Sequence, residues 1–574
     1  MNRSETIAGL RGRNDPAVLV IGGGINGISV FRELALQGVD VLLAEKGDYC
    51  SGASAALSRM VHGGLRYLEN GEFGLVRESL VERDRLLRNA PHFVAPLPTT
   101  VPIFDLFSGI ANGAFRFLGL TRRPSRRGAA VIKVGLTVYD LLTAGRGLMP
   151  RHKFRGRAET LATWPAINPA IRNSATYFDA WVSRPERLGI EMLGDALAAS
   201  PAARALNYMR AGGDADGVTL TDTLTGEELR LRPRLIINAT GGWIDLTNAA
   251  LGARTPTMMG GTKGSHLIID SPELRDALGG HMIYYENEDG RICILFPYLG
   301  NVLVGSTDIR VDDPDAVFCE DGERDYILQS LAYVFPNIRI GAEQIVYQFS
   351  GVRPLPASND SFTGRIPRDH FCETVEARGA LPPVLCMIGG KWTTFRSFGA
   401  MAADMALQRL GAARRIGTET LAIGGGRDFP ADVGRWIGER AAEAGISDAR
   451  MRALFERYGT MSASVGEKQD DAMLPGCDYS EREIERAILC EQVERIDDLL
   501  LRRTTIAVTG ALSFELIDRA LDMLARAKGW DPARRTRERS QFLAMLDRRH
   551  GLDAKKLSAR PGRKSQCASI QKSA

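Results

Sequence analysis

Three glycines near the start of the chain have the spacing of a phosphate-binding turn. Gly22, Gly24 and Gly27 form a GxGxxG sequence between an apolar run, residues 17–21, and a helical pattern, and Glu45 ends the next apolar run. In such a turn the first glycine permits the tight bend, the second lets the backbone approach a pyrophosphate, and the third lets helix and strand pack closely. The helix N-terminus attracts phosphates, and the Glu45 carboxylate can accept hydrogen bonds from a ribose diol. The sequence therefore predicts a bound dinucleotide; the alternative is a glycine-rich turn that arose by chance.

The first turn alone does not distinguish FAD from NAD. Two further glycine turns follow apolar runs far along the chain, ATGG at 239–242 and Gly389-Gly390. A cofactor held by distant parts of the chain indicates FAD extended across its domain, whereas an NAD dehydrogenase usually binds its cofactor within one compact unit. Ordinary packing between a strand and a loop is the simpler explanation for either later turn taken by itself.

A second stretch whose residues could take part in a reaction lies at 58–68 and has the sequence SRMVHGGLRYL. Gly63 and Gly64 let the backbone turn beside a planar ring, and His62 and Arg66 can point to one place from such a turn. Taken by itself, His62 is more simply explained as a buried structural histidine. The stretch becomes informative only in combination with the motifs described below.

The elements that must position these residues follow from hydrophobic periodicity. The chain begins with a strand, a helix and a second strand, passes through two amphipathic helices and a series of short apolar strands, and ends in a long helical pattern. The ranges are 17–45 for the first unit, 72–89 and 186–199 for the helices, 263–310 for the antiparallel strands, 345–396 for a return to strand, turn and helix, and 431–550 for the helical end.

We therefore expect an α/β fold with an α+β substrate-binding part. Residues 16–430 form the oxidoreductase region, with cofactor-binding segments at about 16–100, 186–265 and 345–412 and the strands of a substrate-binding sheet between them. Residues 431–550 form a helical domain. The polar, basic stretch 551–574 is expected to be a disordered tail.

Composition excludes several classes of protein. Lys and Arg number 73 and Asp and Glu 69, a net charge of +4 over 574 residues, which is too small to indicate a nucleic-acid binder. The 8 cysteines are scattered without a CxxC pair, so we expect free thiols in a reducing compartment and no metal site. No apolar segment has the length of a signal-peptide core or of a membrane span, so neither is expected.

The sequence resembles the FAD-dependent glycerol-3-phosphate dehydrogenases of the respiratory type. The resemblance covers roughly residues 16–510, and DDLLLRRT (497–504) is similar to part of the family's helical C-terminal domain. The other matching stretches, in the family's order, are VIGGGINGISV, LSRMVHGGLRYLENGEF, INATGGW, TKGSHLIID, VGSTD, FSGVRPL and IGGKWTTFR.

The resemblance implies a glutathione-reductase-like FAD-binding Rossmann domain, an antiparallel substrate-binding sheet and a C-terminal helical domain. It implies noncovalently bound FAD that accepts a hydride at flavin N5 from the alcohol carbon of a polyol phosphate. The residues expected at the cofactor are Gly22, Gly24, Ile25, Asn26, Gly27, Glu45, Ser54, Ser58, Gly63, Gly64, Leu65, Ala239, Thr240, Gly241, Gly389, Gly390, Lys391 and Thr393.

By the same resemblance, five side chains carry the reaction. Arg353 and Arg66 are expected to bind the phosphate and the rest of the substrate, because the guanidinium fork matches phosphate oxygens. Lys391 is expected near the flavin, where its charge can stabilise a developing anion. His62 and His266 are both candidates for the base that takes the hydroxyl proton. Spacing does not rank the two; we take His266 as the base and His62 as a positioning residue. The residues expected at the substrate are Arg66, Tyr67, His266, Arg353 and Lys391.

Two departures from the family bear on the substrate. Trp181 and the pair Arg184-Pro185 stand where the family often has an acidic pair, and Arg59 stands where a lysine is expected. The first departure leaves D-erythritol 1-phosphate open as an alternative to sn-glycerol 3-phosphate. A non-catalytic flavin-binding scaffold is the alternative of a different class, and the gathering of cations and histidines argues against it.

The electron acceptor is expected to be a membrane quinone, with dioxygen as the alternative. Residues 104–118 (FDLFSGIANGAFRFL) carry apolar side chains at helical spacing and precede Arg122, Arg123, Arg126 and Arg127. Such a stripe is typical of a helix lying in a membrane interface, and equally of a core helix followed by a solvated basic loop. We expect peripheral association with the cytoplasmic face of the membrane. The sequence leaves the oligomeric state, a homodimer included, open.

Overall fold

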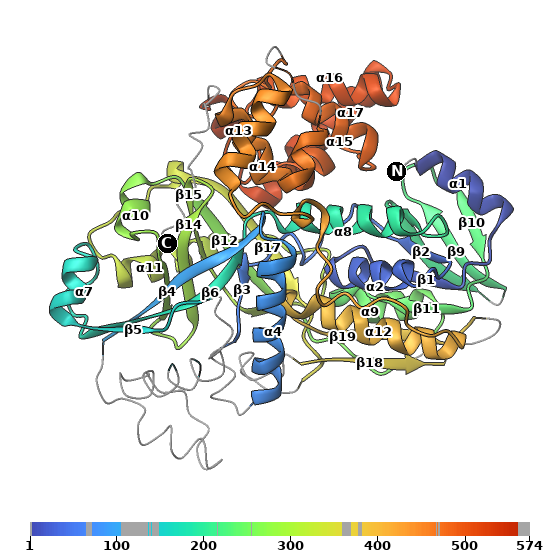
Figure 1. Ribbon diagram of the computed structural model, residues 1–574, viewed down its shortest axis with the longest axis horizontal. Coiled ribbons are helices and arrows are strands. Elements are labelled where there is room, and N and C mark those ends of the chain that lie inside the picture. The colour runs from blue at the N-terminus through green and yellow to red at the C-terminus, as the bar shows by residue number, and fades with distance from the viewer. Residues whose placement is uncertain are drawn as a thin grey trace.

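The structure, a computed structural model, describes residues 3–560 except for gaps at 65–71, 105–135, 137–138, 140–148, 215, 254, 359–368, 377–380, 466–467 and 469–470. Three parts lie side by side in the described chain (Figure 1). A six-stranded sheet with its helices adjoins a ten-stranded sheet, and a group of C-terminal helices lies over both. The seven cysteines within these residues are free thiols.

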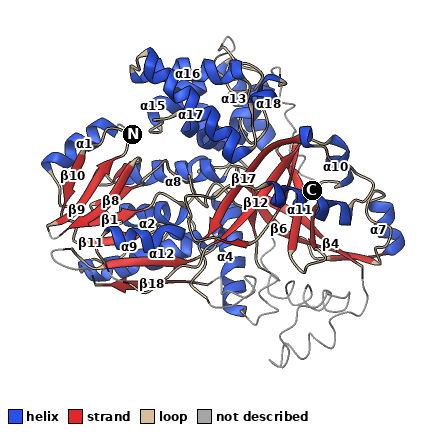
Figure 2. Cartoon of the chain, turned by 180° about the vertical axis from the view of Figure 1, so that it is seen from behind, coloured by secondary structure: helices blue, strands red, loops and turns tan. Residues whose placement is uncertain are grey.

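The six-stranded sheet has the order β18-β19-β11-β1-β2-β7 and is parallel except for the edge strand β18. Both faces are covered, so β1 is a continuous apolar run. Val18 and Val20 face a core with the helices α2, α8 and α12, whereas Leu19 and Ile21 face α1 and a separate three-stranded sheet (Figure 2). The strands are β1 (Val18–Ile21), β2 (Val41–Ala44), β7 (Arg204–Leu206), β11 (Leu235–Asn238), β18 (His370–Val375) and β19 (Val384–Gly389).

Helices and a small antiparallel sheet pack against the six-stranded sheet. α2 begins directly at the GxGxxG turn and is buried along most of its length, because α8 and α12 pack against it. The antiparallel three-stranded sheet covers the other face. These elements are α1 (Arg3–Gly12), α2 (Ile25–Leu36), α8 (Pro185–Ala199), α9 (Ile244–Ala250), α12 (Phe395–Leu410), β8 (Met209–Asp214), β9 (Gly217–Asp222) and β10 (Glu228–Leu231).

The ten-stranded sheet is antiparallel except where β13 runs parallel to β4. Its main path is β16-β12-β15-β14-β13-β4-β6-β3, with β17 beside β12 and β5 beside β6. The strands are β3 (Met60–Val61), β4 (Val94–Ile103), β5 (Lys153–Gly156), β6 (Asn173–Val182), β12 (Thr262–Ile269), β13 (Met282–Glu286), β14 (Ile292–Tyr298), β15 (Asn301–Gly305), β16 (Ile309–Arg310) and β17 (Ile345–Arg353). The residues 345–353, which we assigned to the cofactor-binding part, therefore belong to this sheet.

Helices cover this sheet on both faces. One face packs against α7 (Arg157–Thr163), α10 (Pro272–Ala277) and α11 (Asp321–Val334). α4 (Phe73–Asn89) lies between the two large sheets and packs near the third glycine turn (Figure 1). The expected first unit and the expected helices at 72–89 and 186–199 are all present.

The C-terminal helices from residue 481 onward share one apolar core with the other face of the ten-stranded sheet, whereas the helices at 433–458 have a core of their own. Ile268 and Tyr347 of the sheet and Leu521 and Leu524 of the helices belong to this core. The helices are α13 (Val433–Ala444), α14 (Asp448–Tyr458), α15 (Glu481–Cys490), α16 (Phe514–Lys528), α17 (Pro532–His550) and α18 (Ala554–Ser558), with a π-helix, η7 (Asp498–Arg503), between α15 and α16.

The expectation of a disordered tail from residue 551 is wrong as far as Arg560. Leu552 and Leu557 are buried in the shared core, and Asp553 caps α18 through the N–H of Lys556. Arg560 donates to the carbonyl of Val346 at 2.8 Å. Two leucines at this spacing supply enough apolar surface to hold a short basic helix in place. Residues 561–574 lie outside the described residues.

The packing of α2 on β1 predicts the effect of filling Gly27. A Cβ at this position would overlap the carbonyl oxygen of Gly22, a rigid backbone atom. Gly27→Ala should therefore lower the melting temperature strongly and reduce the flavin content of the purified protein. Gly194→Ala in α8 is the matched control, because a Cβ there meets nothing within 4 Å and alanine favours helix by about 0.5–1 kcal/mol. Circular dichroism melts of both variants check this, and equal melting temperatures would contradict it.

Candidate cofactor and substrate site

A cavity of about 1300 Å³ runs between the two large sheets and under the C-terminal helices. All three parts contribute to its wall: Gly24 from the first glycine turn, His266 and Arg353 from the ten-stranded sheet, and Arg502 and His550 from the C-terminal helices. A cavity of this size accommodates a large cofactor together with a small substrate.

Topology explains why three distant glycine turns meet in this cavity. The turns follow β1, β11 and β19, which are neighbouring parallel strands. The carboxyl ends of parallel strands lie at one edge of a sheet, so the loops that leave them converge there. Figure 1 shows the three strands ending beside the ten-stranded sheet.

The first turn is held by two side chains. Glu45 accepts from the N–H of Gly23 at 2.6 Å and from the N–H of Gly47 at 2.8 Å, which ties the end of β2 to the glycine turn. Ser54 Oγ accepts from the N–H of Ile25 at 2.9 Å, at the N-terminus of α2. Burial raises the pKa of Glu45, and the two N–H donors oppose that change.

This wall fits the pyrophosphate and ribose of FAD. The glycine backbone at the start of α2 leaves N–H groups for phosphate oxygens, and the Glu45 carboxylate keeps lone pairs for a diol. Asn26 Oδ1 is buried on the cavity wall and accepts no hydrogen bond from any described residue. A buried acceptor of this kind fits a donor on a ligand.

Hydrogen bonds to neighbouring side chains hold the second and third turns. The buried Asn238 accepts from both the N–H and the hydroxyl of Thr240, at 3.2 and 2.7 Å. At the third turn Lys391 reaches across to α4, where its Nζ donates to Ser79 Oγ at 3.0 Å. The lysine ammonium is therefore oriented by α4 as well as by the turn that carries it.

Most residues predicted at the cofactor line the cavity. Gly27, Gly63 and Gly389 lie outside its wall, and Leu65, Arg66 and Tyr67 lie outside the described residues. The lining members are Gly22, Gly24, Ile25, Asn26, Glu45, Ser54, Ser58, Gly64, Ala239, Thr240, Gly241, Gly390, Lys391 and Thr393.

His266 is a buried histidine on the cavity wall whose ring is held by packing alone. It stacks on Phe349 with ring centres 5.1 Å apart, and neither ring nitrogen has a hydrogen-bond partner among the described residues. A Cβ at Gly305, its cross-strand neighbour, would overlap the ring. Burial, together with the charges of Arg353 and Arg59, lowers the pKa of His266 to about 3. The ring is therefore neutral, and its nitrogens are available to a ligand.

Arg353 is fixed at the end of β17 by acceptors from the β15–β16 loop. Its guanidinium contacts Asp308 at 2.9 Å, Ser306 Oγ at 3.0 Å and the carbonyl of Thr307 at 3.0 Å. It lies over Gly264, where a Cβ would overlap it. The stretches TKGSH, VGSTD and SGVRPL therefore form one local structure, and the contact between Asp308 and Arg353 was missed although both motifs were recognised.

His62 enters the cavity from the loop after β3. Its N–H donates to Thr393 Oγ1 at 3.3 Å, and the next N–H, of Gly63, donates to Asp179 at 2.9 Å. Asp179 also accepts from Tyr139 and from Arg83, and burial raises its pKa against the effect of Arg83. Asp179 was not among the predicted site residues, because its partners lie 40 to 116 residues away and no local spacing indicates them.

The residues that depart from the family occupy different places. Trp181 is buried and packs edge-on against Phe296 and Tyr298, and it does not line the cavity. Arg184 donates to the carbonyl of Glu456 in α14 at 2.8 Å. Arg59 does line the cavity and pairs with Glu186 at 2.7 Å. The Trp181 and Arg184 changes therefore alter packing rather than the wall that meets a substrate.

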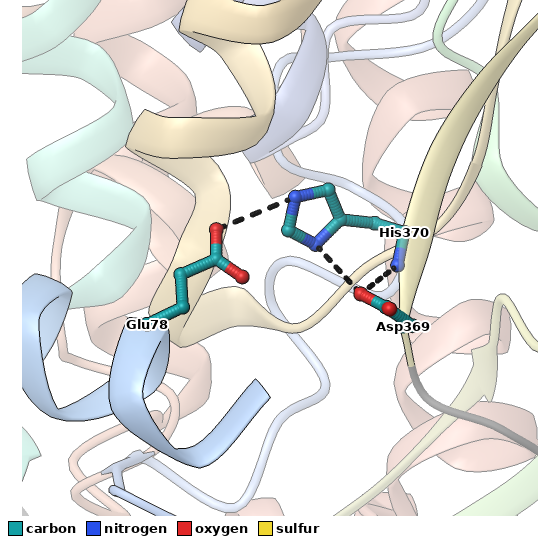
Figure 3. A group of neighbouring side chains, drawn as sticks. All are labelled: Glu78, Asp369 and His370. Carbon is teal, nitrogen blue, oxygen red and sulfur yellow. Dashed lines mark hydrogen bonds and ion pairs between the residues drawn. The ribbon is translucent and has the colours of Figure 1, made fainter. Parts of the chain in front are cut away.

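Glu78, Asp369 and His370 form a cluster beside the third glycine turn (Figure 3). Glu78 lies 3.5 Å from Nε2 of His370, and Asp369 lies 4.0 Å from Nδ1. The Asp369 carboxylate also accepts from the backbone N–H of His370 at 2.9 Å. The cluster joins α4 to β18.

Comparison with known proteins gives the family. Residues 17–396 match the family model described as FAD dependent oxidoreductase, and residues 416–535 match the C-terminal domain of alpha-glycerophosphate oxidase. A glycerol-3-phosphate dehydrogenase of Synechocystis is 30% identical over 539 residues, which are 89% of this chain and 93% of that one. An aerobic glycerol-3-phosphate dehydrogenase of Staphylococcus aureus is 28% identical, with 91% and 92% covered.

A solved structure agrees on the fold. The glycerol-3-phosphate dehydrogenase of Bacillus halodurans, complexed with FAD, superposes with a TM-score of 0.72 at 21% identity and covers 95% of this chain and 97% of that one. The expected fold class and the expected cofactor, FAD, are confirmed. The chain is an FAD-dependent oxidoreductase and belongs to the family of FAD-dependent glycerol-3-phosphate dehydrogenases.

Proposed function

We propose that this enzyme oxidises a polyol phosphate, sn-glycerol 3-phosphate, to its ketone, dihydroxyacetone phosphate. The observation that carries the proposal is that His266 and Arg353 both line the cavity that also contains the dinucleotide turn. A neutral histidine with unpartnered nitrogens suits proton transfer, and a fixed guanidinium suits a phosphate. The names of the relatives in Synechocystis and Staphylococcus support the same substrate.

Four of the five side chains predicted to carry the reaction have a role in this proposal; the fifth, Arg66, lies outside the described residues. FAD, when bound, supplies a hydride acceptor at flavin N5. The Arg353 guanidinium, held by Asp308, Ser306 and the carbonyls of Lys263 and Thr307, attracts the phosphate by its positive charge. Lys391 binds oxygen atoms of the substrate. His266 takes the proton of the reacting hydroxyl at a ring nitrogen. His62, held at the same cavity by Thr393, orients the substrate, and it is the alternative base.

The substrate alternative, D-erythritol 1-phosphate, loses one of its arguments. Trp181 and Arg184, the residues that raised it, lie outside the cavity wall. We therefore place sn-glycerol 3-phosphate first. Anaerobic bleaching of the yellow protein by each of the two phosphates compares them directly, and faster bleaching by erythritol phosphate would reverse the order.

For the acceptor we propose a membrane quinone, with dioxygen as the rival. No helix in the described part of the chain combines the length and apolar character of a membrane span. Phe104, the first member of the apolar stripe, packs against Tyr333 with ring centres 5.1 Å apart, so it belongs to the core. The rest of the stripe, and the four arginines after it, lie outside the described residues.

The proposed anchor predicts the behaviour of Arg353 variants. Arg353→Ala should raise KM for sn-glycerol 3-phosphate by one to two orders of magnitude while flavin content stays normal, because a charge-assisted bond contributes about 1.5–3 kcal/mol. Arg353→Lys should recover only part of the loss, since it lacks the fork. Arg275→Ala, outside the cavity wall, is the control. Steady-state kinetics with a soluble dye measure the effect, and an unchanged KM would remove Arg353 as the anchor.

The proposed base predicts two effects of His266→Gln. The rate constant kcat should fall by about 10²–10⁴ with a smaller change in KM. The folded ring stays neutral to about pH 3, whereas the unfolded chain takes up a proton below about pH 6.5. Stability of the parent apoprotein should therefore fall as the pH is lowered from about 7 to about 5, by about 2 kcal/mol through this residue.

Urea titrations at both pH values separate His266→Gln from the parent. The variant should lose less stability on acidification than the parent. A variant with full kcat would transfer the role of base to His62. Equal acid sensitivity of variant and parent would show that the ring is not held neutral.

The membrane proposal predicts how the stripe at 104–118 acts. Phe107→Asp combined with Phe117→Asp should abolish binding to anionic liposomes and lower quinone-linked activity, while activity with a soluble dye persists. High salt should weaken binding of the parent, because part of the attraction is electrostatic. Co-sedimentation with liposomes measures binding. Equal binding by both proteins would exclude this segment, and a parent that stays in the supernatant would favour dioxygen.

A further inference from the structure

The motif DDLLLRRT at 497–504 has no role in the proposed chemistry, yet its charges are deeply buried. Arg502 and Arg503, at the end of the π-helix η7, both contact the carboxylate of Asp48. The distances are 2.6 Å from Arg502 Nε, and 2.7 and 2.8 Å from the two terminal nitrogens of Arg503. The wider turn of a π-helix rotates consecutive residues through a smaller angle, which helps two neighbouring side chains to reach one partner.

Asp48 belongs to the loop that carries the ribose-binding acid. Glu45, three residues earlier, lines the cavity and holds the N–H of Gly47. The segment after β7 completes this loop: the N–H of Tyr208 donates to Gly47 O at 2.8 Å, and Asn207 Nδ2 donates to Asp48 at 3.1 Å. Tyr208 also extends to η7, where its hydroxyl donates to Asp498 at 2.6 Å. The loop and η7 thus share a continuous set of contacts.

The ion pairs in this set are buried, so water cannot take the place of either partner. The side chains of Asp48 and Arg503 are fully buried, and that of Arg502 is 8% exposed. Burial alone would raise the pKa of Asp48, but the two guanidiniums lower it to about 2. Removing either side leaves an uncompensated buried charge, so the loop keeps this conformation only while η7 is docked.

A second link joins the same loop to the C-terminal helices at the surface. Asp315, from the segment after β16, pairs with Lys46 at 2.9 Å and accepts from Trp243 Nε1 at 2.9 Å. Arg549, near the end of α17, donates to the carbonyl of Asp315 at 3.3 Å. These groups are exposed and contribute little energy, but they converge on the residue directly after Glu45.

We infer that the C-terminal helices are part of the cofactor-binding apparatus of this enzyme. Docking of η7 holds the loop Glu45–Asp48 in the form that binds the cofactor, and the bound cofactor in turn favours the docked position of η7. The two equilibria are coupled, so each must change the other by the same factor. Release of FAD requires η7 to move away from Asp48. This coupling involves FAD and not the proposed substrate.

Hydrogen exchange on the unmodified protein tests the coupling without any substitution. The apoprotein and the FAD-loaded protein are compared by mass spectrometry, with peptides from 495–508 and from α13 read separately. Loss of FAD should speed exchange in 495–508 at least tenfold and leave α13 nearly unchanged. Equal exchange in 495–508 with and without FAD would overturn the inference.

Substitution tests the reverse direction. Asp48→Asn and Arg503→Gln should each raise the rate of FAD dissociation at least tenfold, measured from the fluorescence of flavin released on dilution. Arg519→Gln is the matched control, since it removes an exposed pair with Glu481 inside the helical part and touches nothing in the cavity. Dissociation rates that match the control would refute the coupling. Neither readout involves the substrate, so a failed substrate proposal leaves this test intact.

Discussion

The arrangement of this molecule depends on the neutralisation of charges that are buried between its parts. Asp48, at the end of the first βαβ unit, is ionised in the interior because Arg502 and Arg503 of the C-terminal helices contact it. The series continues, since Glu491 pairs with Arg187 of α8 at 2.6 Å. A buried charge tolerates little displacement of its partner, so these pairs fix the C-terminal helices on the six-stranded sheet.

That placement creates the cavity. The glycine turns, the ten-stranded sheet and η7 each supply part of its wall. Burial of the apolar core shared by the later C-terminal helices and the ten-stranded sheet favours their association. The ion pairs also fix how the packed parts are oriented. Apolar contact alone permits the parts to slide, whereas two guanidiniums on one carboxylate do not.

The charges within the cavity act on both His266 and Arg353. Burial, together with the charges of Arg353 and Arg59, lowers the pKa of His266 and keeps it neutral. Each arginine is itself held by a carboxylate, Asp308 or Glu186. A dianionic phosphate bound to Arg353 would counter part of that repulsion and so raise the proton affinity of the histidine when the substrate arrives. In the proposed function, the residue that binds the anion would thus also adjust the pKa of the base.

The sequence by itself determined the elements and the cofactor. The GxGxxG turn, the acid at the end of the next strand and the later glycine turns predicted FAD, because tight backbone approach restricts those positions to glycine. The motifs around His266 and Arg353 selected residues that do line the cavity. Local sequence was also enough for α4 and α8, whose apolar periodicity is strong.

Only the tertiary structure decided which side chains meet. Asp179 with Gly63, Asp308 with Arg353, and Asp48 with Arg503 are pairs separated by 45 to 455 residues, and no local pattern records such a partner. Trp181 looked like a change in the substrate site and is a packing residue, because the face of a strand that meets a cavity depends on the sheet around it. Residues 551–560 looked like a polar tail and are held by two leucines, because burial depends on the surface offered elsewhere in the chain.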